Sequence, residues 1–246
     1  MKKILLASIL LLSITVQAQK VRVAAAGNLR YILDEIKALY KAKNPKADIL
    51  VTLGSSGSLS QQIINGAEYD FFMAADITFP TKLKQLGIAS GDVKTYAFGK
   101  LVLWSSSLNT SKGIQLLMDD AVHRIAIAKP DAAPYGERAV QCLKYYGLFD
   151  KVSDKIVYAD NIAQAAQFAS TGNAEVGFLA LALALAPDMK GKGTYIELDP
   201  KSYKPVEQAC VLLKGWERNP EAKKFMLFVL SDACKPIFQK YGFILP

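Results

Sequence analysis

Residues 49–64 read Ile-Leu-Val-Thr-Leu-Gly-Ser-Ser-Gly-Ser-Leu-Ser-Gln-Gln-Ile-Ile. The β-type run Ile49–Leu53 predicts a strand, and the apolar spacing after Ser58 predicts a helix. The loop between them holds glycines, which allow a sharp turn and close approach to a ligand, and serines, which cap helices. Because the first N–H groups of a helix lack intrahelical partners, such a loop favours an anion. The alternative interpretation is that Ser56 or Ser58 serves only as an N-cap.

The same layout of strand, small or polar turn and helix occurs four times along the chain. In open α/β sheets, ligands bind beyond the carboxyl ends of the strands. We therefore expect the four turns to meet in a cleft, two from each of two lobes. The turns are Gly27-Asn28, Ser55-Ser56, residues 132–136 and residues 159–162.

Strands and helices alternate almost throughout, which is typical of an α/β fold. Two successive rounds of the pattern predict two lobes, residues 19–99 plus 208–246 and residues 100–207. No flexible linker separates them, so we expect two crossing strands, with residues 101–104 and 210–213 as candidates. Predicted strands cover 20–26, 49–53, 69–74, 98–105, 124–128, 155–159, 175–179 and 206–213. Predicted helices cover 28–43, 59–64, 79–86, 114–119, 134–146, 162–170, the Ala/Leu-rich stretch to 186, 218–231 and 233–241.

The donors in these turns are neutral. Asn28 offers an amide, Ser55 and Ser56 offer hydroxyls, and Tyr135 offers a phenol. Tyr135 and Ile162 can also offer backbone N–H groups. A monoprotonated phosphate would gain from a carboxylate acceptor, and the first two turns contain none. The donor set therefore favours a fully ionised anion of the sulfate or molybdate type.

Catalytic motifs are absent from the sequence. His123 is the only histidine, and residues 54–58 miss the G-x-S-x-G pattern because the fifth residue is serine. Neither a Walker A loop nor a G-x-G-x-x-G motif occurs, so we expect no enzyme and no cofactor.

The amino terminus has the pattern of a cleavable secretory signal. Lys2-Lys3 precedes an apolar run too short to span a bilayer, and we expect cleavage after Ala18 and export to the periplasm. Without the two lysines the net charge falls from +8 to +6. The charges are scattered, so no nucleic-acid partner is indicated.

Three cysteines are present, and none belongs to a C-x-x-C pair. Cys142 lies among apolar residues on a predicted helix, so we expect it in the core. Whether Cys210 and Cys234 form a disulfide is left open by their spacing.

Several segments together resemble the periplasmic molybdate/tungstate-binding proteins of ABC importers. The resemblance covers nearly all of the chain after the signal. It implies a two-lobed periplasmic-binding-protein fold of type II, each lobe a mixed sheet flanked by helices, with a membrane permease and its ATPase as partners. The matching segments are 23–29, 54–57, 62–67, 70–76, 97–104, 133–136 and 241–243.

By position, the resemblance implies that the oxyanion contacts Gly27, Asn28, Ser55, Ser56, Tyr135 and Ile162. We expect the protein to be a monomer. One common form of the family has serine at the position of Asn28 and a ligand tyrosine at that of Ala180. This chain is similar to a subgroup with asparagine in the first turn and tyrosine in the third. Tyr135 could contribute its hydroxyl or its peptide N–H.

Other interpretations remain open at this point. A different tetrahedral oxyanion such as sulfate would suit the same donors. An enzyme acting on a small anion would need a base to activate Ser56, and none is identified. An exported adhesive or sensory domain would carry an exposed apolar patch and no small ligand.

Overall fold

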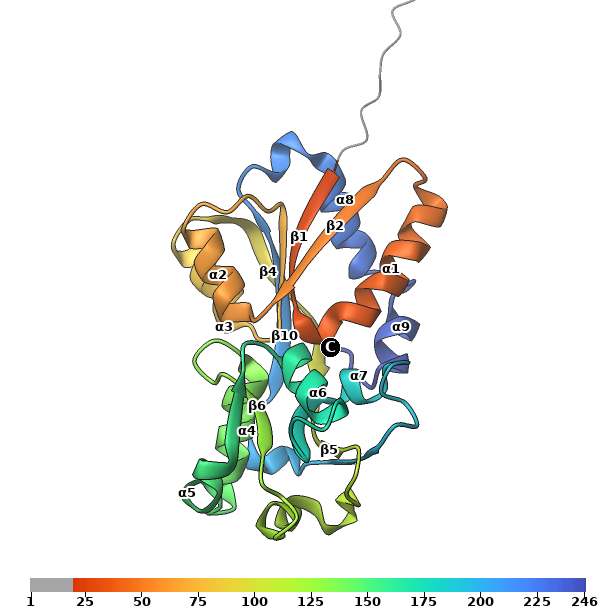
Figure 1. Cartoon of the computed structure of the whole chain (residues 1–246). Helices are drawn as coiled ribbons and strands as arrows, with labels where there is room; N and C mark the ends of the chain where they lie inside the picture. Colours follow the sequence, from red (N-terminus) through yellow and green to blue (C-terminus); the bar gives the residue numbers. More distant parts are fainter. Residues whose placement is uncertain (1–19) are drawn as a thin grey trace, which may run out of the picture.

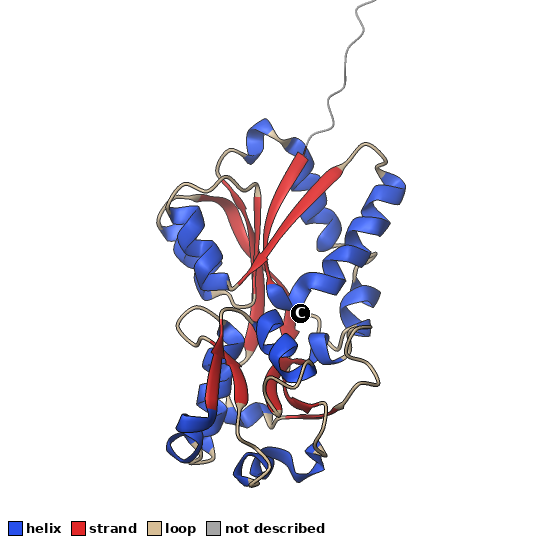
Figure 2. Cartoon of the chain, viewed as in Figure 1, coloured by secondary structure: helices blue, strands red, loops and turns tan. Residues whose placement is uncertain are grey.

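The chain folds into two lobes stacked one on the other (Figure 1). The structure is a computed structural model that describes residues 20–246. The predicted signal peptide, residues 1–18, lies outside the described residues. Each lobe is built on one five-stranded sheet with helices on its faces (Figure 2), as the two-lobed type II fold predicts.

The first lobe has the strand order β2-β1-β3-β10-β4. β1, β2 and β3 are parallel, whereas β10 runs antiparallel to both β3 and β4. One face of the sheet packs on α1, α8 and α9, and the other packs on α2 and α3. The elements are β1 (Lys20–Ala26), α1 (Arg30–Lys43), β2 (Asp48–Gly54), α2 (Ser56–Ile64), β3 (Phe71–Ala74), α3 (Thr78–Gln85), β4 (Ala89–Gly99), β10 (Val206–Leu213), α8 (Pro220–Val229) and α9 (Lys235–Lys240), with the short helices η1 (Gly27–Leu29) and η5 (Trp216–Arg218).

The second lobe has the order β7-β6-β8-β5-β9 and repeats the mixed pattern, with β5 antiparallel to β8 and β9. Its largest fully buried side chain, Trp104, lies in a continuous apolar core between the sheet and its helices. The elements are β5 (Leu101–Ser105), η2 (Thr110–Met118), β6 (Ile125–Ala128), α4 (Pro134–Tyr145), α5 (Phe149–Val152), η3 (Ser153–Lys155), β7 (Ile156–Ala159), α6 (Ile162–Ser170), β8 (Val176–Ala180), α7 (Leu181–Ala184), β9 (Thr194–Glu197) and η4 (Pro200–Ser202).

The chain passes between the sheets at two places. β4 ends at Gly99 in the first sheet and β5 begins at Leu101 in the second; the chain returns where β10 begins at Val206. The single strand predicted for 98–105 is therefore wrong. Neither candidate run, 101–104 or 210–213, itself crosses, because each pairs within one sheet. Apolar patterning does not mark the first crossing, since buried residues, 96–97 and 101–105, lie on both sides of it.

Two strands, β4 and β9, were not predicted from the sequence. Both lie at the edges of their sheets. Edge strands are half-exposed and carry polar residues, as in the exposed or half-exposed run 90–95 of β4. Without a continuous apolar run the strand pattern is weak.

All three cysteines are buried with free thiols, so Cys210 and Cys234 are not bonded to each other. Cys142 lies in the core of the second lobe, as predicted. Within residues 20–246, no helix combines the length and apolarity needed to cross a membrane.

Helix α4 approaches strand β6 closely at Gly136. A Cβ atom placed there would overlap the carbonyl oxygen of Ala128, which belongs to the backbone and cannot swing aside. Gly57, in the first turn of α2, has a different neighbour. Its added Cβ would lie 2.9 Å from Ala132 of the other lobe.

We expect Gly136→Ala to lower the free energy of unfolding by about 2 kcal/mol or more, because it overpacks a rigid backbone contact within one lobe. Chemical denaturation monitored by circular dichroism measures this. The matched control is Gly57→Ala, which should leave stability within about 1 kcal/mol of wild type or raise it. Separation of the lobes relieves the contact with Ala132. The tip of the half-buried Phe79 ring, 3.1 Å away in the same lobe, can shift, and alanine favours the helix. Equal losses in both variants would contradict this account.

Candidate ligand site between the lobes

A small cavity lies where the two lobes meet. Its volume is about 10 Å³, close to that of one water-sized sphere. All six residues predicted from the sequence line it, and none of the lining residues is charged. The lining consists of Ala26, Gly27, Asn28, Gly54, Ser55, Ser56, Ala75, Ala133, Pro134, Tyr135 and Ile162.

The first turn of α2 leaves one N–H group for this cavity. The Gly57 N–H donates to the Ala132 carbonyl oxygen at 2.8 Å, and the Ser58 N–H donates to the Ser55 side chain at 3.3 Å. The next N–H, of Leu59, donates to the Ser55 carbonyl as the first intrahelical bond. Only Ser56 retains a first-turn N–H without an intrahelical or capping partner.

Helix α6 repeats this arrangement from the second lobe. Its N-cap is Asn161, whose side-chain Oδ1 accepts from the N–H groups of Ala163 and Gln164, both at 3.0 Å. The Ala165 N–H bonds the Asn161 carbonyl. The N–H of Ile162 is the one left over at the helix start, and Ile162 lines the cavity.

Helix α4 contributes in a third way. Its first residue, Pro134, has no N–H to satisfy and suits the start of a helix. The first intrahelical bond runs from the Glu137 N–H to the Ala133 carbonyl. The Tyr135 N–H therefore has no partner within the helix, and Tyr135 lines the cavity at 1% exposure.

The two serines have different roles. Ser55 is the N-cap of α2, so the interpretation that Ser56 or Ser58 is the cap is wrong. The Ser56 Oγ accepts from the Ala75 N–H at 2.9 Å, and its own proton remains available for a ligand. Ser55 is the cap because the helix begins at Ser56, three residues before the start that its apolar pattern predicts.

A buried polar network lies behind the cavity at the crossing between the lobes. Gln208 of β10, fully buried, contacts Asn28 of the first lobe at 2.9 Å and the Tyr135 hydroxyl of the second at 3.0 Å. The Tyr96 hydroxyl joins the network, 2.9 Å from Gln208 Oε1. Burial away from water raises the pKa of Tyr135, so its hydroxyl stays protonated. Gln208 was not identified from the sequence, although a polar residue inside a buried strand is the signal that could have found it.

Contacts across the interface show that the lobes are closed. Besides the Gly57–Ala132 bond, the Tyr31 hydroxyl of α1 donates to Asp188, in the segment after α7, at 2.6 Å. Partial burial, together with Asp188, raises the pKa of Tyr31 to about 12. Gly27 also faces the other lobe, since a Cβ there would lie 3.3 Å from Ala163 and Asn161.

The comparisons with known proteins agree with this architecture. A family model described as bacterial extracellular solute-binding protein matches residues 21–244. The chain belongs to this family.

Similar relatives of this solute-binding protein include two proteins named molybdate-binding protein ModA. The one from Azotobacter vinelandii is 35% identical over 236 residues, covering 95% of this chain and 93% of the relative. The one from Rhodobacter capsulatus is 35% identical over 242 residues, covering 97% and 94%.

Solved structures share the fold. The Azotobacter vinelandii periplasmic molybdate-binding protein superposes with a TM-score of 0.86 at 33% identity, covering 92% of this chain and 99% of that one. The Mycobacterium tuberculosis sulfate-binding protein SubI has a TM-score of 0.75 at 14% identity, covering 92% and 86%, and is a likeness of fold alone.

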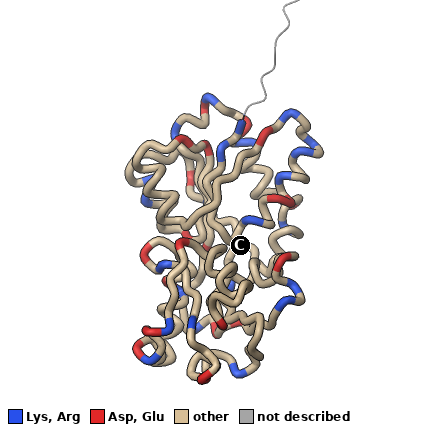
Figure 3. Tube along the Cα trace, viewed as in Figure 1, with Lys and Arg blue, Asp and Glu red and all other residues tan. Residues whose placement is uncertain are grey.

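Charged residues of this solute-binding protein are distributed along the chain of both lobes (Figure 3), and most of them are exposed or half-exposed. Two exceptions lie near the cavity. Asp76, which follows the lining residue Ala75, is 5% exposed, and Arg138 of α4 is 7% exposed. Arg138 Nη1 lies 2.7 Å from Glu137. Neither Asp76 nor Arg138 was identified from the sequence, because nothing in their neighbours marks them as buried.

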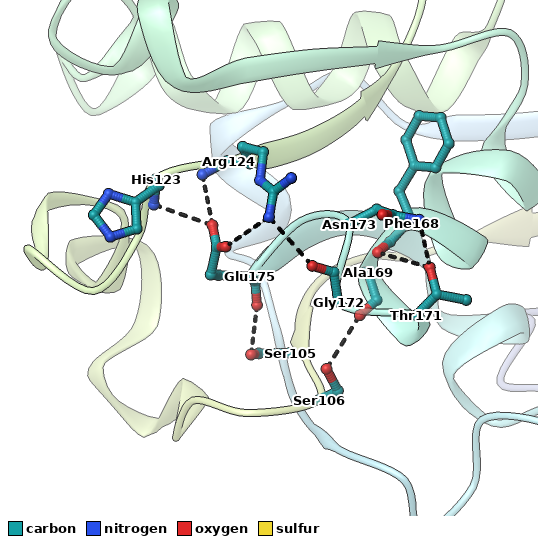
Figure 4. A network of polar contacts seen from close by, with 10 residues as sticks. All are labelled: Ser105, Ser106, His123, Arg124, Phe168, Ala169, Thr171, Gly172, Asn173 and Glu175. Carbon is teal, nitrogen blue, oxygen red and sulfur yellow. Dashed lines mark hydrogen bonds and ion pairs between the residues drawn. The ribbon is translucent and has the colours of Figure 1, made fainter.

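His123 lies at the opposite end of the second lobe. It precedes β6, whereas the cavity loops follow the carboxyl ends of the strands. The Glu175 carboxylate accepts from the backbone N–H groups of His123 and Arg124 at 3.1 and 2.6 Å, and the imidazole points away from these contacts (Figure 4). His123 therefore takes no part in the cavity. Among residues 20–246, no group of three or more His, Cys, Asp or Glu side chains could hold a metal ion.

Burial raises the pKa of Asp76, and this effect outweighs the hydrogen bond from Phe79 and the charge of Arg138. A carboxyl whose pKa is raised binds its proton more tightly when folded. Its contribution to stability is therefore greatest below its ordinary pKa and falls as the pH rises through the raised value.

We expect Asp76→Asn to raise the melting temperature at pH 7 by a few degrees, about 2–4 °C for each 1 kcal/mol, and to change it little at pH 3. The amide keeps an oxygen to accept from the Phe79 N–H. Calorimetry at the two pH values measures the difference. Asp160→Asn, at an exposed carboxylate, is the control and should change little at either pH. A loss of stability at pH 7 in Asp76→Asn would contradict the expectation.

Proposed function

We propose that this protein captures molybdate or tungstate in the periplasm and delivers it to the permease and ATPase of an ABC importer. Membership of the solute-binding family and the two relatives named for molybdate support this function. In this proposal the protein is exported by its amino-terminal signal and acts as a monomer.

The observation that carries the proposal is the set of donors around the cavity. Ser56, Tyr135 and Ile162 each bring a helix-start N–H, from three helices of two lobes. A hydrogen bond to a charged group contributes about 1.5–3 kcal/mol, and each helix dipole adds about 0.3–1 kcal/mol. A few such contacts are enough to hold a small dianion without a cationic side chain.

The size of the cavity limits what can bind in the closed state. A volume of about 10 Å³ leaves no room for an organic substrate. A tetrahedral inorganic anion also exceeds this volume, but it requires less separation of the lobes than an organic molecule would. This supports a binding protein over an enzyme that acts on a small organic anion.

The chemistry of the lining favours a fully ionised anion. Donors predominate, and none of the lining residues is a carboxylate that could accept a proton from the ligand. The carboxylates near two of the turns lie outside the lining. Asp160 pairs with Lys129 at 2.6 Å, and Glu137 pairs with Arg138. Monoprotonated phosphate is therefore disfavoured.

Closure of the lobes supplies the signal that a permease can recognise. The donors come from both lobes, so the anion completes its set of hydrogen bonds only when the lobes are together. A ligand that binds the closed state better shifts the population toward it.

We expect calorimetric titration to show tight binding of molybdate and tungstate, weaker or no binding of sulfate, and no binding of phosphate. The neutral donor set and the absence of a lining carboxylate disfavour phosphate. Sulfate would suit the same donors, so its weaker binding is expected from its smaller size. Binding of phosphate without detectable binding of molybdate would overturn the proposed function. Binding of sulfate without detectable binding of molybdate would replace it by sulfate capture on the same donors.

A single substitution tests one backbone donor. Ile162→Pro removes the N–H at the first position of α6, where proline is favoured, and the extended backbone of Asn161 tolerates a following proline. We expect molybdate affinity to fall about tenfold or more, since 1.4 kcal/mol corresponds to a factor of ten.

Ile162→Ala is the matched control. It shortens the same buried side chain but keeps the N–H, so its affinity should stay well above that of the proline variant. Titration of both variants, with circular dichroism to verify folding, makes the comparison. Equal affinities would show that this N–H does not bind the anion.

A further inference from the structure

The polar network behind the cavity has one proton too few at the Tyr96 hydroxyl. The Tyr96 hydroxyl lies 2.9 Å from the Ala74 carbonyl oxygen and 2.9 Å from Gln208 Oε1. A hydroxyl has one proton, and a carbonyl can only accept. One proton cannot serve both oxygens, so one of these two contacts would bring unbonded lone pairs together.

A second problem concerns the Asn28 amide, whose oxygen lacks a hydrogen-bond partner. Its Nδ2 lies 2.9 Å from Gln208 Oε1, and its Oδ1 is buried without a hydrogen-bond partner. Asn28 is 1% exposed and lines the cavity. With this orientation, the branch of the amide that is free for a ligand would be an oxygen, which repels an anion.

Turning both amides by 180° resolves the two problems together. The NH2 of Gln208 then donates one proton to the Tyr96 oxygen and one to the Asn28 oxygen. Tyr96 gives its own proton to Ala74, and the Tyr135 hydroxyl donates to the Gln208 oxygen at the 3.0 Å contact. Every contact has one donor and one acceptor, and the free branch of Asn28 becomes its NH2.

From this arrangement we propose that Gln208 is a positioning residue that aims the Asn28 NH2 at the anion. The Tyr135 hydroxyl donates its only proton to the Gln208 oxygen. Tyr135 therefore binds the anion through its peptide N–H. The inference rests on the proposed function and deepens it.

The surroundings hold Gln208 in place. It is fully buried in β10 beside a bulge. Gly99, at the crossing from β4 to β5, leaves room for the network, because a Cβ there would overlap the Tyr135 hydroxyl and lie 2.6 Å from the branch of the Gln208 amide that contacts Tyr135. The amide of Gln208 thus has contacts on both branches, which restrict its orientation.

The orientation of the Asn28 amide also determines which anions the site prefers. If the Asn28 oxygen faced the cavity, it could accept the proton of monoprotonated phosphate. With the NH2 facing the cavity, both amide protons serve a fully ionised oxyanion. Gln208 therefore acts on discrimination between molybdate and phosphate without contacting either.

The first experiment is a double-mutant cycle with molybdate as the probe. Gln208→Met removes the network at similar volume, and we expect about a tenfold loss of affinity. In the background of Asn28→Ala, the same substitution should change affinity by less than about twofold, because the residue through which it acts is gone. Equal losses in both backgrounds would overturn the proposal and leave Gln208 a structural hinge residue.

Tyr135→Phe separates the two possible roles of the tyrosine. It removes the hydroxyl but keeps the peptide N–H, so it should retain at least tenfold more molybdate affinity than Asn28→Ala. A loss as large as that of Asn28→Ala would overturn this part of the proposal.

A second measurement needs neither ligand nor a binding-competent variant. In NMR spectra of the unliganded wild-type protein, the side-chain amide protons of Gln208 should show nuclear Overhauser contacts to the ring of Tyr96. Contacts to the ring of Tyr135 instead would overturn the orientation. If the wild type bound none of the oxyanions, the proposed function would fail while this measurement still decided the orientation.

Discussion

A helix cannot pair its own first N–H groups, and this constraint underlies the whole interface between the lobes. In α2 and α6 the cap residues satisfy the second or third N–H and leave the first. In α4 a proline removes the first donor, and the second is left. The unpaired N–H groups would be a cost if each remained in a separate dry environment. In the proposed function, gathering them at one cavity turns this cost into binding capacity for an anion.

Gathering donors from different helices requires the backbones to come close, and small residues permit it. At Gly57 and Gly27 a side chain would meet the opposite lobe, and at Gly136 it would meet the strand beneath α4. These glycines all have ordinary negative φ angles. They are needed because a side chain would not fit, and not because the backbone requires a conformation that only glycine adopts. Their positions also explain the small volume of the closed cavity, because the facing turns approach to van der Waals contact.

The sequence predicted the parts of the site that depend on local patterns. Strands β1 and β10 and helix α6 have the bounds that the apolar patterns indicated. Six of the eleven residues that line the cavity are those named from the turns at the carboxyl ends of strands and from the family resemblance. The parts that depend on tertiary placement were missed. The burial of Asp76, Arg138 and Gln208 depends on which surfaces face each other after closure, and no local pattern contains that information.

The choice of asparagine in the first turn makes a positioning residue necessary. A serine hydroxyl can rotate to give its proton to whichever acceptor is near, but an amide presents either two protons or an oxygen. Asn28 can therefore attract or repel an anion, and a second amide with fixed partners is a direct way to hold one orientation. Gln208 lies on the strand with which the chain re-enters the first lobe, close to both crossings. Residues near a hinge move least when lobes separate, so the proposed network would keep Asn28 oriented before the anion arrives. The open protein then has less side-chain freedom to lose on binding, which is the physical advantage of placing this contact at the hinge and not at the rim of the cleft.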